Sequence, residues 1–293
     1  AASFAHERVP KLDVFDVIDK FKKKFFGNRK KSVVTEGYVE KVEGVYDWTY
    51  FDTELARVAA AGKPVLLRIP SGGRNTPKWV FDAGVQTFSF VDQNPYHGTY
   101  GQTITIPVFW DPVFLEKKRR FIQAMGQHFA SNPQIVLVSS SCANADSDDW
   151  NVPDDTLEDI NNWLAAGYTS EKLIQACKEI IDTTMAAFPS QHVLMGIGRH
   201  KITETNPDSV ARGVVTEARS RYPSRFITHK NSLSAKTPDP ALTSTLKAWQ
   251  VLYEQRPQVA GQMVWFVTND STCRMNGKVA PCDPATVLKQ AVT

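Results

Sequence analysis

The chain has 293 residues, of which 42% are hydrophobic and 22% are charged, and its formal net charge is +3. This composition is typical of a globular protein with a sizeable core and excludes a disordered or fibrous chain. The charge is too small to indicate a nucleic-acid partner, and no apolar stretch is long enough to cross a membrane.

The N-terminal region carries a run of basic residues: Lys20, Lys22, Lys23, Lys24, Arg29, Lys30 and Lys31. Such a run is typical of a nucleic-acid or membrane-surface patch, or of a solvated helix face with the loop after it, and the low net charge favours the solvated face. We therefore expect a helical, basic extension over 1–31 and one domain over 32–293. The opening AASFAHERVP has no Met and no leader, which is typical of a secreted or periplasmic chain after signal removal, or of a shortened chain.

From residue 32, strand and helix patterns alternate. A β-branched run predicts a strand over 32–39, and a turn follows at Glu43-Gly44. Asp52 is expected to cap a helix that ends at Gly62. The apolar run 64–69 predicts the next strand.

The segment after that strand is long and rich in Gly and aromatic residues. We expect 70–102 to cover the strand ends as a functional loop, with room for one or two further strands within 85–106.

The stretch 107–153 predicts a complete helix-to-strand unit. Asp111 and Pro112 are expected to begin the helix, whose apolar residues recur at helical spacing, and Ser131-Asn132-Pro133 ends it. The apolar run 134–138 predicts a strand covered on both faces. Three aspartates and a tryptophan follow at once: Asp146, Asp148, Asp149 and Trp150.

The alternation continues to the C-terminus. Helices are predicted over 169–188, with Thr169 as the cap, and over 208–222, 242–255 and 285–292; strands are predicted over 192–198, 225–229 and 262–268. Parallel strands joined by helices give an α/β fold. About six strands are secure, and a closed (β/α)8 TIM barrel fits them best. A doubly wound open sheet is the alternative, but it lacks a GxGxxG or P-loop motif.

The four cysteines do not indicate a metal site, because no CxxC pair or His-rich spacing accompanies them. Cys273 and Cys282 bracket a short polar segment and are expected to form a small disulfide loop. Cys142 follows a predicted strand, and Cys177 lies on the apolar face of a helix, where a free buried thiol is the usual state. No cofactor is indicated.

Three segments resemble catalytic barrels of the large retaining glycoside hydrolase superfamily, closest to bacterial β-galactosidase-like and cellulase-like proteins. They read EGVYDWTYFDTELARVAAAGKPVLLRI, TPKWVFDAG and IPVFWDPVFLEKKRRFIQAMGQHFASNP. The resemblance covers roughly residues 36–155. It implies an acid/base carboxylate just after the fourth strand, where Asp149 is the first candidate and Asp146 and Asp148 stand behind it.

The late-strand nucleophile that the resemblance implies is missing. That residue is normally Glu, but no Glu follows Glu254, and the late strand reads GQMVWFVTND. Asp270 is the candidate for the second carboxylate. Its shorter side chain widens the gap between the two carboxyl groups and favours a water-mediated inverting reaction. Alternatively, the site has lost its chemistry and kept its sugar binding.

Six residues are candidates for substrate binding: Trp265, Trp150, Trp79, Arg68, Asn231 and Lys230. An indole ring can stack on the apolar face of a sugar, although each Trp can equally fill the core or the barrel rim. Arg68 ends an apolar strand, where it must be paired, either with a structural partner or with a catalytic carboxylate. Glu36 is expected to be a solvated loop residue.

Three functions remain open. The first is a hydrolase that cleaves the glycosidic bond of an oligo- or polysaccharide, with Asp149 as general acid/base. The second is an inactive barrel that binds a glycan without cleaving it. The third is a lyase or aldolase that uses Lys230 for a Schiff base. The first two imply a carbohydrate partner, and none fixes the oligomeric state.

Overall fold

The structure is a computed structural model that describes residues 35–95, 97–145, 150–198, 202, 209–231 and 247–262. Its strands are β1 (Val65–Leu67), β2 (Thr87–Val91), β3 (Thr103–Pro107), β4 (Ile135–Ser140), β5 (His192–Gly196), β6 (Phe226–Asn231) and β7 (Val259–Gln262). Its helices are α2 (Glu36–Val39), α3 (Thr49–Ala60), α4 (Lys78–Asp82), α5 (Pro112–Phe129), α6 (Leu157–Ala165), α7 (Ser170–Ala187), α8 (Ser209–Arg221) and α9 (Lys247–Glu254), with a 3₁₀ turn η1 (Gly73–Asn75).

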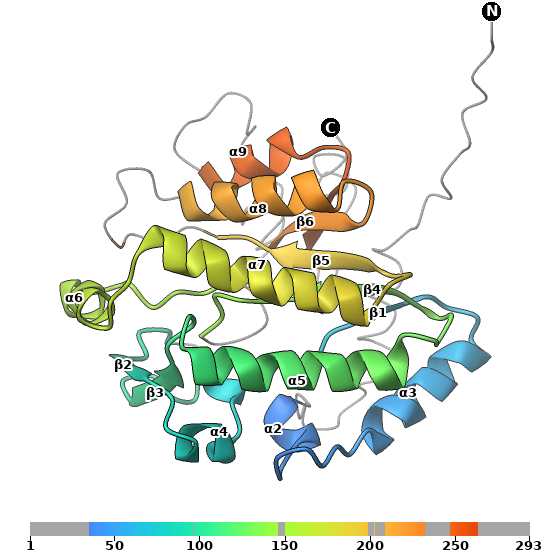
Figure 1. Ribbon diagram of the computed structural model, residues 1–293, viewed down its shortest axis with the longest axis horizontal. Helices are drawn as coiled ribbons and strands as arrows, with labels where there is room; N and C mark the ends of the chain where they lie inside the picture. The colour runs from blue at the N-terminus through green and yellow to red at the C-terminus, as the bar shows by residue number, and fades with distance from the viewer. Residues whose placement is uncertain are drawn as a thin grey trace, which may run out of the picture.

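Five strands form one parallel sheet in the order β1-β4-β5-β6-β7, and β2 and β3 form a separate antiparallel hairpin. Helices α5, α7 and α8 lie side by side in front of the sheet (Figure 1). Each parallel neighbour is reached through a helical crossover, as parallel pairing requires. The predicted α/β class and parallel sheet are confirmed.

The sheet is curled rather than flat. Arg68 follows β1 and donates from Nη1 to Oε1 of Gln262 on β7 at 2.9 Å. These two strands are the opposite edges of the sheet, and in a flat sheet their axes would lie about 19 Å apart, farther than the two side chains can span. The described residues therefore form a partial barrel, with five of the strands that a closed (β/α)8 barrel needs.

Long helices begin where the sequence predicts. The Asp111 carboxylate accepts from the Phe114 backbone N–H at 2.9 Å, and Pro112 is the first helical residue of α5. Thr169 caps α7 by accepting from the Lys172 N–H at 3.2 Å. Both helices bury an apolar face, and they pack on each other in front of the sheet (Figure 1).

The strand predicted over 32–39 is wrong in its described part, because residues 36–39 form the short helix α2. The Glu36 N–H donates to the Pro70 carbonyl at 2.9 Å, and the Glu36 carboxylate accepts from the Gly72 N–H at 3.2 Å. These contacts with the segment after β1 override the β propensity of the run.

Two element boundaries also differ from the prediction. Helix α3 begins at Thr49 with Trp48 at its N-cap, so Asp52 is inside the helix, where its carboxylate lies 2.8 Å from His128 Nε2. Strand β7 starts at Val259, three residues before the predicted start.

The expectation of a free Cys177 is wrong, because Cys142 and Cys177 form a disulfide with their Cα atoms 4.9 Å apart. Cys142 lies just beyond β4, and Cys177 lies on the face of α7 that packs against the sheet. Cys273 and Cys282 lie outside the described residues.

Replacing both Cys142 and Cys177 with Ala is expected to lower the free energy of unfolding by about 4 kcal/mol, because the bond closes a loop of 35 residues that the unfolded chain otherwise samples freely. Urea unfolding followed by circular dichroism measures the change. The same loss is expected for the wild type in the presence of a reductant. A loss below about 1 kcal/mol in both experiments would contradict the assignment.

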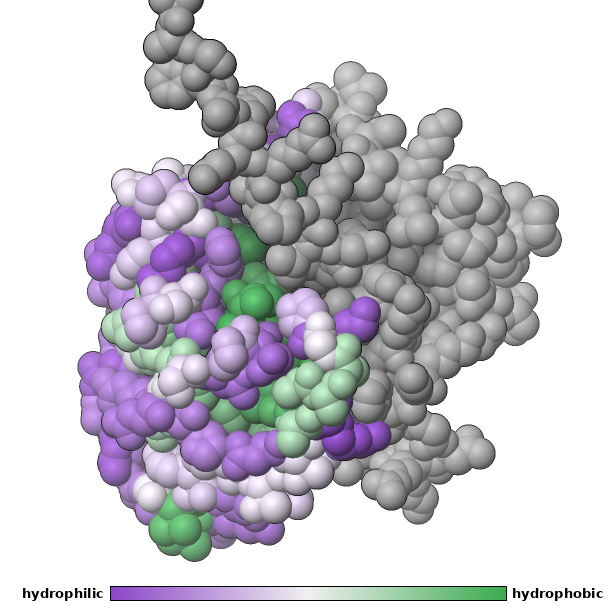
Figure 2. Space-filling view, turned by 90° about the vertical axis from the view of Figure 1, so that its right-hand side faces the viewer, coloured by the Kyte–Doolittle hydropathy of each residue, from purple (hydrophilic) through white to green (hydrophobic). Residues whose placement is uncertain are grey.

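The side of the molecule shown in Figure 2 is largely hydrophilic, with hydrophobic residues gathered toward the middle of the described surface. Among the helices in the described ranges, none is both long and apolar enough to span a bilayer.

Candidate functional site at the carboxyl edge of the sheet

The two faces of the parallel sheet differ in character. Side chains alternate along a strand, and one set, which includes Leu67, Val138, Val193 and Phe226, belongs to the cores under the helices. The other set faces the inside of the curl. Since Arg68 and Gln262 meet across the sheet from its two edges, their side chains lie on this inner face.

The inner face changes from apolar to polar along the strands. Toward the amino ends it presents Leu66, Leu137, Leu194 and Ile227. Toward the carboxyl ends it presents Arg68, Ser141, Gly196, His229, Asn231 and Gln262. In barrels of this class, the carboxyl end is the face that carries the chemistry. The polar set therefore marks the candidate site.

Arg68, Asn231 and Gln262 lie together in this set. Asn231 and Gln262 are register partners on β6 and β7, and Gln262 accepts the hydrogen bond from Arg68. The Asn231 Oδ1 is buried and has no hydrogen-bond partner among the described residues. A buried amide oxygen of this kind is suited to accept from a hydroxyl group.

The exit of β4 is closed into a narrow loop. The Asn151 N–H donates to the Ala143 carbonyl at 2.7 Å, and the Ala145 N–H donates to the Asn151 carbonyl at 2.9 Å. Trp150 packs on Gly198, two residues beyond β5, so closely that a Cβ at Gly198 would lie 2.6 Å from the Trp150 ring. Trp150 thus lies at the carboxyl edge of the sheet, and its role in substrate binding stays a prediction.

A buried polar cluster connects the segment after β4 to helix α5 and to the segment after β1. Lys118 of α5 is 2% exposed, and its Nζ lies 3.3 Å from both the Ser71 carbonyl and the Asn144 Oδ1. The Asn144 amide also donates to the Ser71 carbonyl at 2.6 Å. These bonds join the segment after β1 to the segment after β4, so the two loops are held as one unit.

Glu36 completes the cluster and is 2% exposed, which corrects its expected place in a solvated loop. Burial raises the pKa of Glu36 to about 8, and the nearby Glu40 adds to the rise, while Lys118 and the Gly72 N–H oppose it. In the folded protein Glu36 therefore keeps its proton at neutral pH.

Glu36→Gln is expected to flatten the pH dependence of stability. In the wild type, the folded state holds a proton on Glu36 between pH 4.5 and about 8, whereas the unfolded state has released it. The free energy of unfolding should therefore fall as the pH rises through this window. Urea unfolding at a series of pH values tests this, with Glu54→Gln on α3, a half-buried carboxylate paired with Arg57, as the control. An equal slope in the wild type and in Glu36→Gln would contradict the buried, protonated Glu36.

Of the remaining candidate residues, five lie outside the described ranges and two, Trp79 and Lys230, have their side chains in contact with other parts of the fold. Asp146, Asp148, Asp149, Trp265 and Asp270 lie outside the described residues. Trp79 lies on α4, where its Nε1 donates to the Glu40 carbonyl at 2.9 Å. The Lys230 Nζ lies 5.6 Å from the centre of the Trp249 ring on α9, so Lys230 is directed toward the helices rather than the inner face.

Sequence reasoning missed Gln262 and Lys118. Gln262 was expected only as a residue of a strand, and Lys118 occupies one position in a basic run, KKRR, that is typical of a solvated helix face. Its i−3, i+3 and i+4 neighbours, Leu115, Phe121 and Ile122, are buried core residues, and this spacing is the signal that places Lys118 on the buried side. Over the described ranges, no group of three or more His, Cys, Asp or Glu side chains is arranged to hold a metal ion.

A family model described as β-galactosidase, that of glycoside hydrolase family 42, matches residues 37–183. Among curated proteins, none matches the chain.

Several solved structures are similar to the chain. The β-galactosidase from Marinomonas ef1 is 12% identical with a TM-score of 0.45, and the match covers 73% of this chain and 38% of that one. The β-galactosidase from Halorubrum lacusprofundi is 14% identical (TM-score 0.42; 70% and 35% covered), and endo-glycoceramidase II from Rhodococcus sp. is 13% identical (0.39; 78% and 62%). The chain thus spans less than two thirds of each of these proteins.

Proposed function

The chain belongs to glycoside hydrolase family 42, whose model matches half of it, and from this we propose that it is a glycosidase that cleaves a bond in an oligo- or polysaccharide. The polar inner face at the carboxyl edge of the sheet carries this proposal. It brings Arg68, Asn231 and Gln262 together on the same inner face. Groups that donate and accept hydrogen bonds at such an edge suit a ligand rich in hydroxyl groups.

In our proposal, Asp149 is the general acid. Its carboxyl group donates a proton to the glycosidic oxygen, the bond from that oxygen to the anomeric carbon breaks, and the leaving sugar departs as an alcohol.

The second carboxylate in the proposal is Asp270. It takes a proton from a water molecule while the water oxygen bonds to the anomeric carbon, so the reaction inverts the anomeric configuration. Asp148 stands beside Asp149 as a reserve candidate for the acid. Trp265 and Trp150 are proposed to stack on the sugar, while Arg68 orients a carboxylate or a hydroxyl group.

One observation favours an inactive glycan-binding protein as the second candidate. The segment GQMVWFVTND, where the late strand is expected, carries no Glu, the residue that such barrels normally use there as the nucleophile. A barrel that keeps the Trp and Asn side chains but lacks a working pair of carboxylates would still bind a sugar.

Hydrolysis of chromogenic glycosides, with β-galactosides first in the panel, separates these functions. The proposal expects turnover of at least one member, and product anomers followed by NMR from the first seconds report inversion. Binding of galactose or an oligosaccharide by calorimetry, without turnover of any member, would contradict the enzyme and support the binding protein. If the protein neither binds nor hydrolyses any member of the panel, both functions are contradicted.

A further inference from the structure

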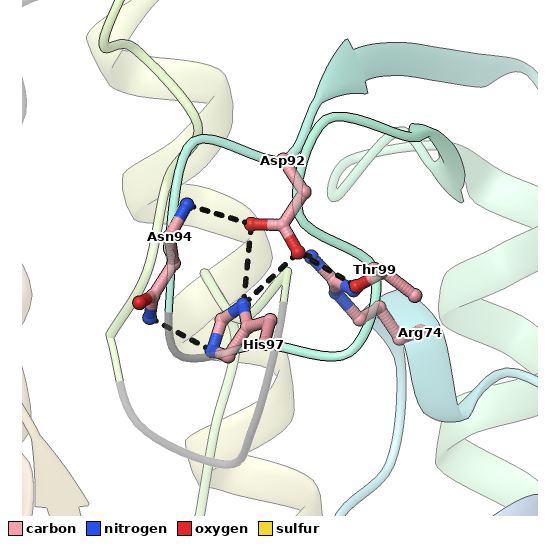
Figure 3. Close-up of polar contacts among 5 residues, drawn as sticks. All are labelled: Arg74, Asp92, Asn94, His97 and Thr99. Atoms are coloured by element: carbon pink, nitrogen blue, oxygen red, sulfur yellow. Dashed lines mark hydrogen bonds and ion pairs between the residues drawn. The ribbon is translucent and has the colours of Figure 1, made fainter.

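Buried polar groups in the described part of the chain differ in how fully their hydrogen bonds are satisfied. The Asp92 carboxylate, at the tip of the β2–β3 hairpin, has a full set of partners (Figure 3). It accepts from the Thr99 hydroxyl at 2.6 Å and from the Asn94 backbone N–H at 3.0 Å, and it lies 2.9 Å from Arg74 Nη2 and 3.1 Å from His97 Nδ1. These donors occupy the acceptor positions of a carboxylate, so none remains for a ligand.

The inner face at the carboxyl edge of the sheet differs, because it holds a buried acceptor that lacks a donor. The Asn231 Oδ1 has no hydrogen-bond partner among the described residues, although the oxygen itself is buried. Asn231 as a whole is half-buried, as are Arg68 and Gln262. An unsatisfied buried acceptor costs free energy, which a ligand with a hydroxyl donor would recover.

Gln262 supplies a matching donor, and Arg68 fixes the direction in which that donor faces. A guanidinium group only donates hydrogen bonds, so Arg68 Nη1 must meet the amide oxygen of Gln262, as it does at 2.9 Å. The Gln262 Nε2 therefore lies on the side of the amide away from Arg68. Turning the amide over would exchange this hydrogen bond for a contact between two donors, so the hydrogen bond settles its orientation.

The donor of Gln262 and the acceptor of Asn231 lie next to each other. The two residues are register partners on the neighbouring strands β7 and β6, which lie about 4.8 Å apart, and both side chains lie on the inner face. Arg68 reaches Gln262 from the opposite edge of the sheet, so the Nε2 faces the strand that carries Asn231. A hydroxyl group between them can accept from Gln262 Nε2 and donate to Asn231 Oδ1 at the same time.

We propose that Gln262 and Asn231 together recognise one hydroxyl group of the sugar, and that Arg68 is the positioning residue that orients the Gln262 amide. This inference rests on the proposed function, because it takes the ligand to be a carbohydrate. A ligand group that only accepts or only donates satisfies one of the two side chains and leaves the other unpaired. The pair therefore selects a hydroxyl group, which does both.

Calorimetry with deoxy sugars tests the pair without any turnover. The probes are galactose, glucose and mannose, which have no glycosidic bond to cleave, and the monodeoxy analogues of whichever of them binds best. In the wild type, removal of one particular hydroxyl group should raise Kd about tenfold or more, because it leaves both side chains without their partner. If none of the sugars binds, or if every deoxy analogue binds as tightly as its parent, the proposal is overturned.

Substitutions at Gln262 separate recognition of the hydroxyl group from a purely structural contact with Arg68. Gln262→Met removes both, and Kd of the parent sugar should rise about tenfold. Gln262→Glu keeps an acceptor for Arg68 but has no N–H to donate. Its Kd should rise by a smaller factor, about threefold or more, because the hydroxyl group can still donate to Asn231. Wild-type affinity in Gln262→Glu would mean that Gln262 only braces Arg68, which overturns the proposal.

Gln258→Met is the matched control, because Gln258 directly precedes β7, at the amino end of the same strand. Its Kd values should equal those of the wild type within about twofold. Asn231→Ala covers the case in which Gln262→Met does not fold, since it removes the acceptor of the same pair. Removal of the recognised hydroxyl group should then raise Kd less than about threefold. A folded Asn231→Ala that keeps the full wild-type penalty, or an equal loss of affinity in Gln258→Met, would overturn the proposal.

The same measurements distinguish failure of this inference from failure of the proposed glycosidase. Sugar binding with the predicted dependence on one hydroxyl group, but without turnover of any glycoside, contradicts the glycosidase and supports the pair. Turnover of a glycoside without dependence on any hydroxyl group in the calorimetry overturns the pair alone.

Discussion

Asp149→Asn is expected to lower kcat/KM by about 10²- to 10⁴-fold, the contribution of a positioned general acid. Asn has nearly the same shape as Asp but cannot donate a carboxyl proton to the leaving oxygen. Substrate binding should persist, because the sugar contacts proposed for Trp150, Arg68 and Asn231 are untouched. The measurement is hydrolysis of the best substrate of the panel, with calorimetry of the variant against the same compound.

Asp155→Asn is the matched control for this variant. Asp155 is exposed and follows the same loop by a few residues, so its replacement removes one carboxylate near the site without touching the proposed acid. We expect its kcat/KM to remain within about twofold of the wild type, as for most surface changes. Wild-type turnover in Asp149→Asn would exclude Asp149 as the acid and direct attention to Asp148.

Trp163→Ala is expected to lower the free energy of unfolding by about 3–5 kcal/mol, the cost of removing a large buried aromatic. Trp163 of α6 is 0% exposed, and its ring stacks on Phe88 of β2 with centroids 3.7 Å apart. Its Nε1 also donates to the Pro153 carbonyl at 2.7 Å. The loss therefore combines a cavity with an unsatisfied buried carbonyl.

The same residue ties the hairpin to the chain just after the aspartate segment, so the variant should lose activity as well as stability. Chemical unfolding measures the stability, and Leu164→Ala is the control, because Leu164 is the next residue on α6 and is 41% exposed. A cost for Trp163→Ala no larger than that for Leu164→Ala would show that α6 does not anchor the hairpin.

Local signals in the sequence were sufficient for much of the fold. The pairs Asp111-Pro112 and Thr169-Ser170 mark where α5 and α7 begin, because capping depends on residues within one helical turn. The apolar run before Ser139 marks β4, and its place between two helices implies parallel pairing. The alternation of strands and helices also predicts which segments lie at the carboxyl ends of the strands. It places Arg68 at the end of its strand.

Contacts between distant segments explain the errors. Glu36 meets Gly72 at a separation of 36 residues, Cys142 meets Cys177 at 35, and Arg68 meets Gln262 at 194. No periodicity encodes such pairs, so helix α2, the disulfide and the partner of Arg68 could not be read from local patterns. The proposed carboxylates Asp149 and Asp270 rest on their places in the chain relative to β4 and β7.

The most direct test of the proposed glycosidase is the distance between the carboxyl groups of Asp149 and Asp270 in an experimental structure with a bound sugar. We predict a separation of roughly 6.5 to 9.5 Å, as in an inverting pair, with the sugar between them and against the inner face that carries Arg68 and Gln262. A structure with the two carboxyl groups at opposite ends of the sheet, or with Asp149 directed away from that face into solvent, would contradict the proposal.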